Sequence, residues 1–348
     1  MLRFFIIFLL SINVANARYE NYAAMAINTK DGEVLYSQNP DKKVHLASIT
    51  KLMTLYLSFE ALQDGRISIN DKVIISNTAA KQLPISINLI EGKKYSIKEL
   101  ILSTAIFSAN DAAVALAEEI AGNVEDFVYL MNKKAKQLGL NNTEYGNATG
   151  MPDSINYSTP KDIINLIQTL RQDFPQYYII FSIELLAQRG KIYSNSNKLL
   201  PYFKGMDGVK TGFTDIAGRN LACSFKYNDH NIISVVFGMS SRAERDKHMK
   251  EIMDYSVKKV LSRKMIKDEK TNDMILEYDH FLKTNDVKVV ERGLYFTILN
   301  NIFDQSKQNK NTIASLDRKS ISILDKALSE ISGFGDLMSY PLPIINDE

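Results

Sequence analysis

The stretch Met206-Asp-Gly-Val-Lys-Thr-Gly-Phe-Thr-Asp215 decides how the rest of the sequence is interpreted. It contains the tripeptide Lys210-Thr211-Gly212 at the end of a predicted strand. There a glycine would let a substrate backbone approach the strand edge, the lysine would add positive field, and the threonine hydroxyl would bind a carboxylate. The backbone N–H of Phe213 would then face a developing oxyanion. Taken alone, the same residues also fit a turn with a surface lysine.

Two short motifs precede this stretch, Ser48-Ile-Thr-Lys51 and Ser108-Ala-Asn110. The pattern S-x-x-K occurs three times, so its position has to distinguish the copies. Ser158-Thr-Pro-Lys161 has a proline at the first helical position and predicts a helix start. Ser256-Val-Lys-Lys259 lies late in a predicted helix, where lysines complement the helix dipole. Only Ser48 opens a strongly apolar helix directly after a loop.

The spacing of Ser48 and Lys51 indicates a nucleophile and its base. Residues three apart lie on one face of a helix. The lysine can accept the serine proton if burial and nearby positive charge lower its pKa. The backbone N–H groups at the start of the helix would face the oxyanion. The alternative is an ordinary N-cap serine beside a solvated lysine.

Ser108 and Asn110 interrupt two predicted apolar helices, residues 97–106 and 111–121, at a polar connector. A hydroxyl and an amide projecting from it would line a cleft, where the serine relays a proton and the amide holds a substrate carbonyl. The alternative is a pair of helix-capping residues.

The order of predicted elements indicates an α/β protein of the α+β type. Strands are predicted at 21–27 and 33–36 around the turn Lys30-Asp31-Gly32, and at 208–211, 220–226 and 231–237. Helices are predicted at 48–62, 97–106, 111–121, 125–138, 159–172 and 243–261. Because strands occur at both ends and helices between them, we expect an antiparallel sheet in which N- and C-terminal strands meet, flanked by helices.

Composition excludes several classes of protein. The net charge of the 348 residues is only +2, so no nucleic-acid footprint is indicated. A single cysteine, Cys223, rules out an intramolecular disulfide and cysteine zinc or redox motifs, and its place in a predicted strand favours buried packing. The four histidines do not pair at metal-ligand spacing, so no metal and no cofactor are expected.

The first residues predict a signal peptide. Arg3 precedes the apolar run Phe4 to Leu10, and Ala15-Asn16-Ala17 has the small-x-small pattern of a cleavage site. The run is shorter than the roughly 20 residues that a membrane span needs. We expect residues 1–17 to be removed after Ala17, with an uncleaved interfacial anchor as the alternative.

Beyond residue 262 the sequence changes character. Charged and Asn-rich stretches surround short apolar pieces, with a possible hairpin at 287–299 and helical spacing at 315–331. We expect a catalytic domain at 18–262 and an appendage at 263–348. The candidate helix of the appendage carries charges of both signs, whereas an interfacial anchor has a basic polar face, so the sequence gives little support for membrane association by this tail.

The three motifs in this order are typical of active-site-serine β-lactamases and penicillin-binding proteins. From about Tyr22 to Leu261 the chain resembles the serine D-alanyl-D-alanine carboxypeptidases, the low-molecular-mass penicillin-binding proteins. The contexts Ala47 to Thr54, Ser108 to Ala112, Gly146 to Pro152 and Asn195 to Leu200 share the resemblance. It implies a transpeptidase-like fold with a helical subdomain beside the sheet.

The resemblance implies a periplasmic hydrolase of peptidoglycan stem peptides that contacts the inner membrane at most peripherally. Ser48 would attack the bond between two terminal D-alanines, with Lys51 as base, and β-lactams would acylate the same serine. Ser108 and Asn110 would line the opposite wall of the cleft. Lys210 and Thr211 would bind the terminal carboxylate, and the N–H groups of Ser48 and Phe213 would form the oxyanion hole.

Three other functions stay open. A D,D-endopeptidase would use the same residues on cross-links. A non-catalytic wall-binding homologue would retain the cleft. A β-lactamase is disfavoured because no Glu-x-x-x-Asn element follows Ser108-Ala-Asn110 in a convincing place.

Overall fold

The computed structural model describes residues 21–203, 205–228 and 230–265. The expected signal peptide 1–17, the hairpin 287–299, the helix 315–331 and nearly all of the appendage 263–348 lie outside these residues. Among the residues described, no helix combines the length and the apolar character that crossing a membrane requires.

A five-stranded antiparallel sheet forms the centre of the fold, in the order β2-β1-β11-β10-β9. Its strands are β1 (Ala23–Asn28), β2 (Glu33–Gln38), β9 (Met206–Thr214), β10 (Gly218–Tyr227) and β11 (His230–Met239). The first and last strands of the chain pair directly, with Ala26 opposite Ser234, as the sequence predicted. Strand β9, which carries Lys210, is an edge strand, paired on one side only among the described strands.

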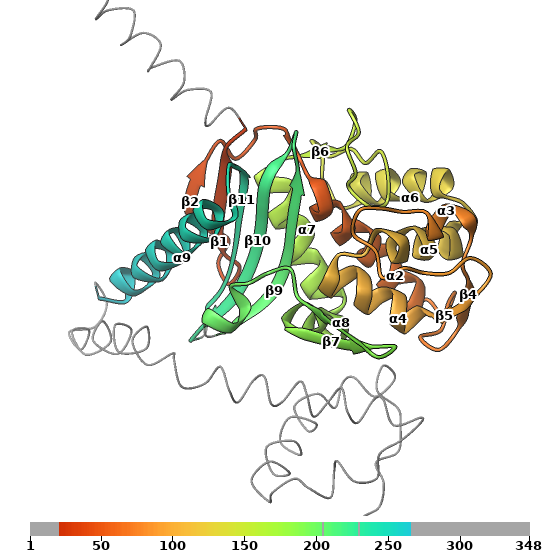
Figure 1. Ribbon diagram of the computed structural model, residues 1–348. Helices are drawn as coiled ribbons and strands as arrows, with labels where there is room; N and C mark the ends of the chain where they lie inside the picture. Colours follow the sequence, from red (N-terminus) through yellow and green to blue (C-terminus); the bar gives the residue numbers. More distant parts are fainter. Residues whose placement is uncertain (1–20, 204, 229, 266–348) are drawn as a thin grey trace, which may run out of the picture.

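Helices cover both faces of the sheet (Figure 1). The long helix α9 (Arg242–Met265) packs on one face, and α2 (Lys51–Gln63) and α7 (Pro160–Asp173) lie on the other. Neighbouring side chains on a strand point to opposite faces of the sheet. Val235 therefore packs in the hydrophobic cluster that includes α2, and Val236 packs in the hydrophobic cluster on the other face, which includes α9. The strands are therefore apolar on both faces.

Beside the sheet lies a helical region that packs around α2 (Figure 1). It contains α3 (Asn77–Ala80), α4 (Ile97–Leu102), α5 (Asn110–Ala121) and α6 (Val124–Gln137). A capping box begins α4, since Ser96 accepts from the Glu99 N–H and Glu99 accepts from the Ser96 N–H. Helix α2 is buried on nearly every side, which makes it the central helix of this half.

Two predicted helices differ from the observed ones. The predicted helix 48–62 begins with a 3₁₀ turn, η1 (Ala47–Thr50), so Ser48 lies in that turn and α2 starts at Lys51. The predicted helix 97–106 changes after α4 into a π-helical turn, η2 (Ser103–Phe107). In η2 the Ser103 and Thr104 hydroxyls donate to carbonyls one turn back, which competes with regular helical bonding.

The segment 173–205, unassigned from sequence, and several short connections also form regular structure. These elements are β3 (Val44–His45), β4 (Lys72–Ile74), β5 (Lys94–Ser96), β6 (Tyr157–Ser158), α8 (Pro175–Tyr178), η3 (Ile179–Ser182), β7 (Leu185–Gln188), β8 (Lys191–Ser194) and η4 (Leu200–Tyr202). They are too short to show a clear period in the sequence.

The Asn-rich loop 141–156 packs against the turn that carries Ser48. Gly150 has φ +81°, and a Cβ added there would lie 1.8 Å from the Ala47 carbonyl oxygen. A side chain at this position would therefore meet both an unfavourable backbone conformation and a backbone clash.

We expect Gly150→Ala to lower the free energy of unfolding by about 3 kcal/mol or more, because η1 must move to admit the methyl group. Gly139→Ala is the matched control, since Gly139 has φ +71° but nothing within 4 Å of an added Cβ. The control should lose only about 1 kcal/mol. Urea unfolding of the three proteins measures both; equal losses in the two variants would contradict the packing argument.

Candidate active site

The Lys51 amine is the point where the first two motifs meet. Its Nζ lies 3.0 Å from Ser48 Oγ, 2.7 Å from Asn110 Oδ1 and 2.6 Å from the Thr149 carbonyl oxygen. These partners come from η1, the start of α5 and the loop 141–156. Lys51 itself is fully buried, whereas Ser48 is half-buried. The alternative of a solvated lysine beside an N-cap serine is therefore wrong.

The three contacts specify how a neutral Lys51 would be oriented. The Thr149 carbonyl and Asn110 Oδ1 can only accept hydrogen bonds. They take both N–H bonds of a neutral amine and leave its lone pair toward Ser48. The Ser48 hydroxyl is then the one partner that can donate to the amine.

The orientation of the Asn110 amide follows from its other contacts. Asn110 Nδ2 lies 3.3 Å from the Leu83 carbonyl oxygen, which must accept, so Oδ1 faces Lys51. Nδ2 also lies 3.7 Å from Met151 Sδ. Sequence reasoning gave this amide a substrate carbonyl to hold; in the structure it also holds Lys51.

The environment of Lys51 favours the neutral amine. Burial lowers its pKa well below the usual value, the nearby positive charge of Lys210 lowers it further, and the Asp111 carboxylate opposes the shift. Both conditions that a lysine base requires, burial and neighbouring positive charge, are therefore met.

Ser108 stands at a sharp change of backbone direction. It has φ +72° at the end of η2, and it separates that turn from α5. Its Oγ is buried and has no hydrogen-bond partner among the described residues, so it does not cap a helix. A buried hydroxyl without a partner costs free energy unless a further group completes it, as a bound substrate would.

Strand β9 presses against the segment that carries Ser48. A Cβ on Gly212 would lie 2.7 Å from the Leu46 carbonyl oxygen and 3.2 Å from the Ser48 nitrogen. The sequence predicted that the missing side chain of Gly212 makes room for a substrate backbone. In the structure, the chain's own backbone at Leu46 and Ser48 occupies that room. The glycine therefore brings the edge strand and the serine together.

Lys210 and Thr211 lie beside this contact and are both buried. Lys210 Nζ donates to the Thr211 carbonyl at 3.2 Å. Burial lowers the pKa of Lys210 to about 7, and the positive charge of Arg245 contributes to the shift. The alternative of a surface lysine in a turn is wrong, since β9 continues to Thr214.

Phe213 follows directly on the free edge of β9. Its side chain is 49% exposed, and its ring lies against the Arg219 guanidinium. Alternate backbone groups of an edge strand have no partner strand and remain available to a ligand.

Sequence reasoning gave no role to four residues that shape this site. The Thr149 carbonyl binds Lys51, and Asn147 Oδ1 fixes that turn by accepting from the Thr149 and Gly150 N–H groups. Asn220 is fully buried and donates to the His45 and Leu46 carbonyls just before Ser48. The sequence offered only a Gly- and Asn-rich loop and a polar residue within an apolar strand.

Asp111 is the fourth of these residues. Its buried carboxylate accepts from the Ser86 hydroxyl and from the Ile87 and Leu89 N–H groups. It thereby fixes the loop that carries Ile85, whose carbonyl accepts from the Asn110 N–H. A carboxylate in an otherwise apolar helix was the signal that could have identified it.

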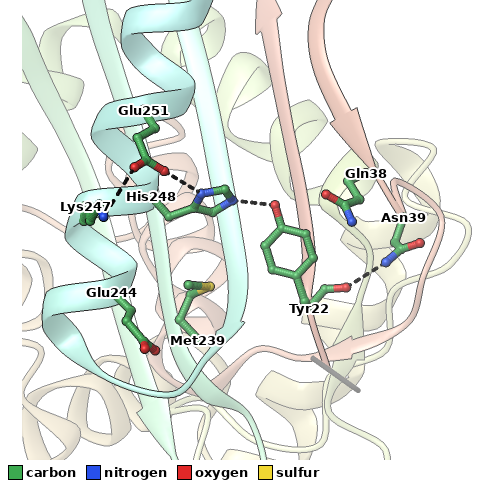
Figure 2. Close-up of a pocket in the computed structure, with 8 residues that line it drawn as sticks. All are labelled: Tyr22, Gln38, Asn39, Met239, Glu244, Lys247, His248 and Glu251. Atoms are coloured by element: carbon green, nitrogen blue, oxygen red, sulfur yellow. Dashed lines mark hydrogen bonds and ion pairs between the residues drawn. The ribbon is translucent and has the colours of Figure 1, made fainter. Parts of the chain in front are cut away.

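Two cavities lie near these elements. One, of about 370 Å³, is lined partly by Thr149 and Met151 and so adjoins the contacts of Lys51 and Asn110. The other, of about 530 Å³, lies between α9 and the first two strands, on the side of the sheet away from β9 (Figure 2). There Tyr22 and His248 share a 2.6 Å hydrogen bond. None of the motif residues lines the second cavity.

Within the described residues, no three His, Cys, Asp or Glu side chains converge where they could hold a metal ion. Cys223 is buried in β10, and burial raises the pKa of its thiol. Its predicted role in packing is confirmed by its place in the apolar cluster beneath α9.

Comparison with known proteins gives consistent relatives. A family model described as D-alanyl-D-alanine carboxypeptidase matches residues 11–241. D-alanyl-D-alanine carboxypeptidase DacF of Bacillus subtilis is 36% identical over 257 residues, 73% of this chain and 66% of its own. The structure of penicillin-binding protein 5 from Haemophilus influenzae has a TM-score of 0.65 and 33% identity, covering 67% of this chain and 69% of that one.

A third relative has a ligand. Penicillin-binding protein D2 of Listeria monocytogenes, in its cefotaxime-bound form, has a TM-score of 0.63 and 31% identity, covering 68% of this chain and 96% of that one. The chain spans 66% of the length of the Bacillus protein and 61% of that of a Haemophilus influenzae relative, less than two thirds in both cases.

We expect Asn220→Ala to lower the free energy of unfolding by about 2–3 kcal/mol, because two carbonyls before Ser48 and the Gly238 N–H lose their buried partner. Asn141→Ala, at an exposed loop residue, is the control and should change it by less than about 0.5 kcal/mol. Urea denaturation measures both. An unchanged midpoint for Asn220→Ala would show that Asn220 does not hold η1 against the sheet.

Proposed function

The chain belongs to the D-alanyl-D-alanine carboxypeptidase family, and on that premise we propose that it removes the terminal D-alanine of peptidoglycan stem peptides through an acyl-enzyme on Ser48. The observation that carries the proposal is the Lys51 amine, whose two other partners leave its lone pair for the Ser48 hydroxyl. Export to the periplasm, where such a substrate lies, belongs to the same proposal.

The reaction begins with proton transfer from Ser48 to Lys51. Ser48 Oγ attacks the carbonyl carbon between the two D-alanines, and Lys51 Nζ takes the hydroxyl proton. The carbonyl oxygen becomes an oxyanion, which the backbone N–H groups of Ser48 and Phe213 stabilise. The approach of Gly212 to the Ser48 nitrogen supports this pairing of donors.

The leaving D-alanine departs on the Lys210 side of the site. Its carboxylate binds Lys210 and the Thr211 hydroxyl, and the Ser108 hydroxyl relays a proton to its nitrogen. Ser108 suits this task because its buried Oγ has no other partner among the described residues. Water then attacks the Ser48 ester, with Lys51 again as the base, and releases the shortened stem.

β-Lactams are inhibitors under this proposal. The Listeria relative was captured with cefotaxime bound, and a second structure holds ampicillin. A β-lactam presents a strained amide and a carboxylate to the same groups as the D-alanyl-D-alanine end. Acylation of Ser48 without a free leaving group would then block the site.

A fluorescent penicillin should label the wild-type protein and not Ser48→Ala, because no other hydroxyl adjoins the Lys51 amine among the described residues. Release of D-alanine should fall by about 10⁶ in kcat. Ser256→Ala is the control: Ser256 begins another S-x-x-K sequence, but its Oγ donates to the Ile252 carbonyl within α9.

Equal labelling of wild type and Ser48→Ala would end the nucleophile assignment. Product analysis on intact muropeptides separates the possible reactions. Free D-alanine supports the proposal, whereas split cross-linked dimers without D-alanine would make the protein an endopeptidase. Binding of muropeptides without either product would make it a non-catalytic wall protein.

We expect kcat/KM to fall as the pH rises through about 7. This parameter reports the free enzyme. In the free enzyme, burial lowers the pKa of Lys210 to about 7. Above that pH Lys210 loses the charge that binds the carboxylate of the terminal D-alanine. Lys51 acts as a base only when neutral, and burial together with the positive charge of Lys210 lowers its pKa well below the usual value, which favours that neutral form.

Lys210→Arg tests the assignment of the descending limb, because a guanidinium does not titrate in this range. The variant should have a lower kcat/KM than the wild type at every pH, but this lower value should not fall further as the pH rises above 7. Stopped assays of D-alanine release between pH 5 and pH 10 measure both profiles; an identical descending limb in the variant would contradict the role of Lys210.

A further inference from the structure

Phe213, which is exposed, and Arg219, which is partly buried, form a pair directly after Lys210-Thr211-Gly212 on the edge strand and its neighbour. They are directly opposite each other in the register of β9 and β10. The Arg219 guanidinium carbon lies 3.9 Å from the centre of the Phe213 ring, which fixes the arginine over the edge strand. Phe213 is 49% exposed, so this part of the edge is open to a ligand.

Arg219 has no carboxylate partner among the described residues. The exposed arginine Arg189 offers a comparison, since it stacks on Tyr95 at 3.9 Å and also binds Glu99 at 2.7 Å. Arg219 makes the same kind of stacking contact without an anion. The acidic residue nearest in sequence, Asp215, is exposed on the turn after β9 and makes no ion pair either. A charge of each sign is therefore available at this corner.

The direction of the substrate along β9 places it beside this corner. In the proposed reaction the terminal carboxylate lies at Lys210 and Thr211, and the carbonyl under attack lies at the Phe213 N–H. The rest of the stem then continues past Thr214 toward Asp215. Strand residues advance about 3.3 Å each, so the third stem residue, which immediately precedes the attacked D-alanine, lies one such step beyond it, and its long side chain can extend toward the β9–β10 turn.

We propose that Arg219 binds a free carboxylate at the end of the side chain of the third stem residue, so that the protein prefers stems built on diaminopimelate. This side chain ends in an ammonium and a carboxylate, whereas a lysine side chain ends in an ammonium alone. Arg219 takes the carboxylate and Asp215 the ammonium. The inference rests on the proposed function, since it assumes that the stem lies along β9.

The test compares two pentapeptides that end in D-alanyl-D-alanine and differ only at the third residue, free diaminopimelate against its side-chain carboxamide. The two have the same size and differ in charge. Released D-alanine gives kcat/KM for each with wild type, Arg219→Gln and Arg219→Lys. We expect wild type to prefer the free carboxylate about three- to fivefold, the range of an exposed ion pair.

The preference should disappear in Arg219→Gln, which removes the charge but keeps a polar side chain, and persist at least in part in Arg219→Lys, which keeps the charge. Arg189→Gln is the matched control and should keep the wild-type ratio, because Arg189 lies on the β7–β8 turn and contacts Glu99 instead. Thermal unfolding of each variant confirms that it is folded.

Equal wild-type activity on the two peptides would overturn the inference, and so would a preference that Arg219→Gln leaves unchanged. Either result leaves the proposed function intact, because D-alanine is still released. Release from neither peptide by the wild type is a different outcome, since it removes the proposed function and the inference with it.

Discussion

The site depends on one buried amine. Lys51 is placed where water cannot solvate its charge, and three hydrogen-bond partners from separate segments take the place of water. Two of them can only accept, so a neutral Lys51 directs its lone pair to Ser48. Burying an unpaired lysine would cost several kcal/mol, so the segments that bear Ser48, Asn110 and Thr149 must all be in place for the fold to be stable. Structure and proposed catalysis therefore require the same contacts.

The second constraint is the close approach of the edge strand. Gly212 brings β9 against Leu46 to Ser48, and Asn220 ties the neighbouring strand to the same segment. This contact places Lys210 near enough to Lys51 to lower its pKa, while Arg245 in turn lowers that of Lys210. The positive charges of Lys210 and Arg245 thus favour a neutral Lys51. They also favour the binding of an anion, such as the substrate carboxylate, beside Lys210.

Much of the fold was predictable because its signals are local. The hairpin at Gly32, the capping box at Ser96 and the Pro160 helix start each depend on a few adjacent residues, and all three are present. The meeting of first and last strands was predicted from their order and is confirmed. The 3₁₀ turn at Ser48 and the π-helical turn before Ser108 were not predicted, because the spacing of apolar residues does not distinguish such turns from regular α-helix.

The sequence by itself determined which residue types were available and in what order: a serine three residues before a lysine, a serine and an asparagine between two helices, and a lysine and a glycine on a strand. It also determined the family and the fold class. Only the tertiary structure decided that the lysine loses its hydration, that a loop carbonyl completes its contacts and that Gly212 packs against the chain's own backbone. These properties depend on groups that are about 60 to 160 residues apart in the chain, and the pattern of a single segment carries no information about its distant neighbours.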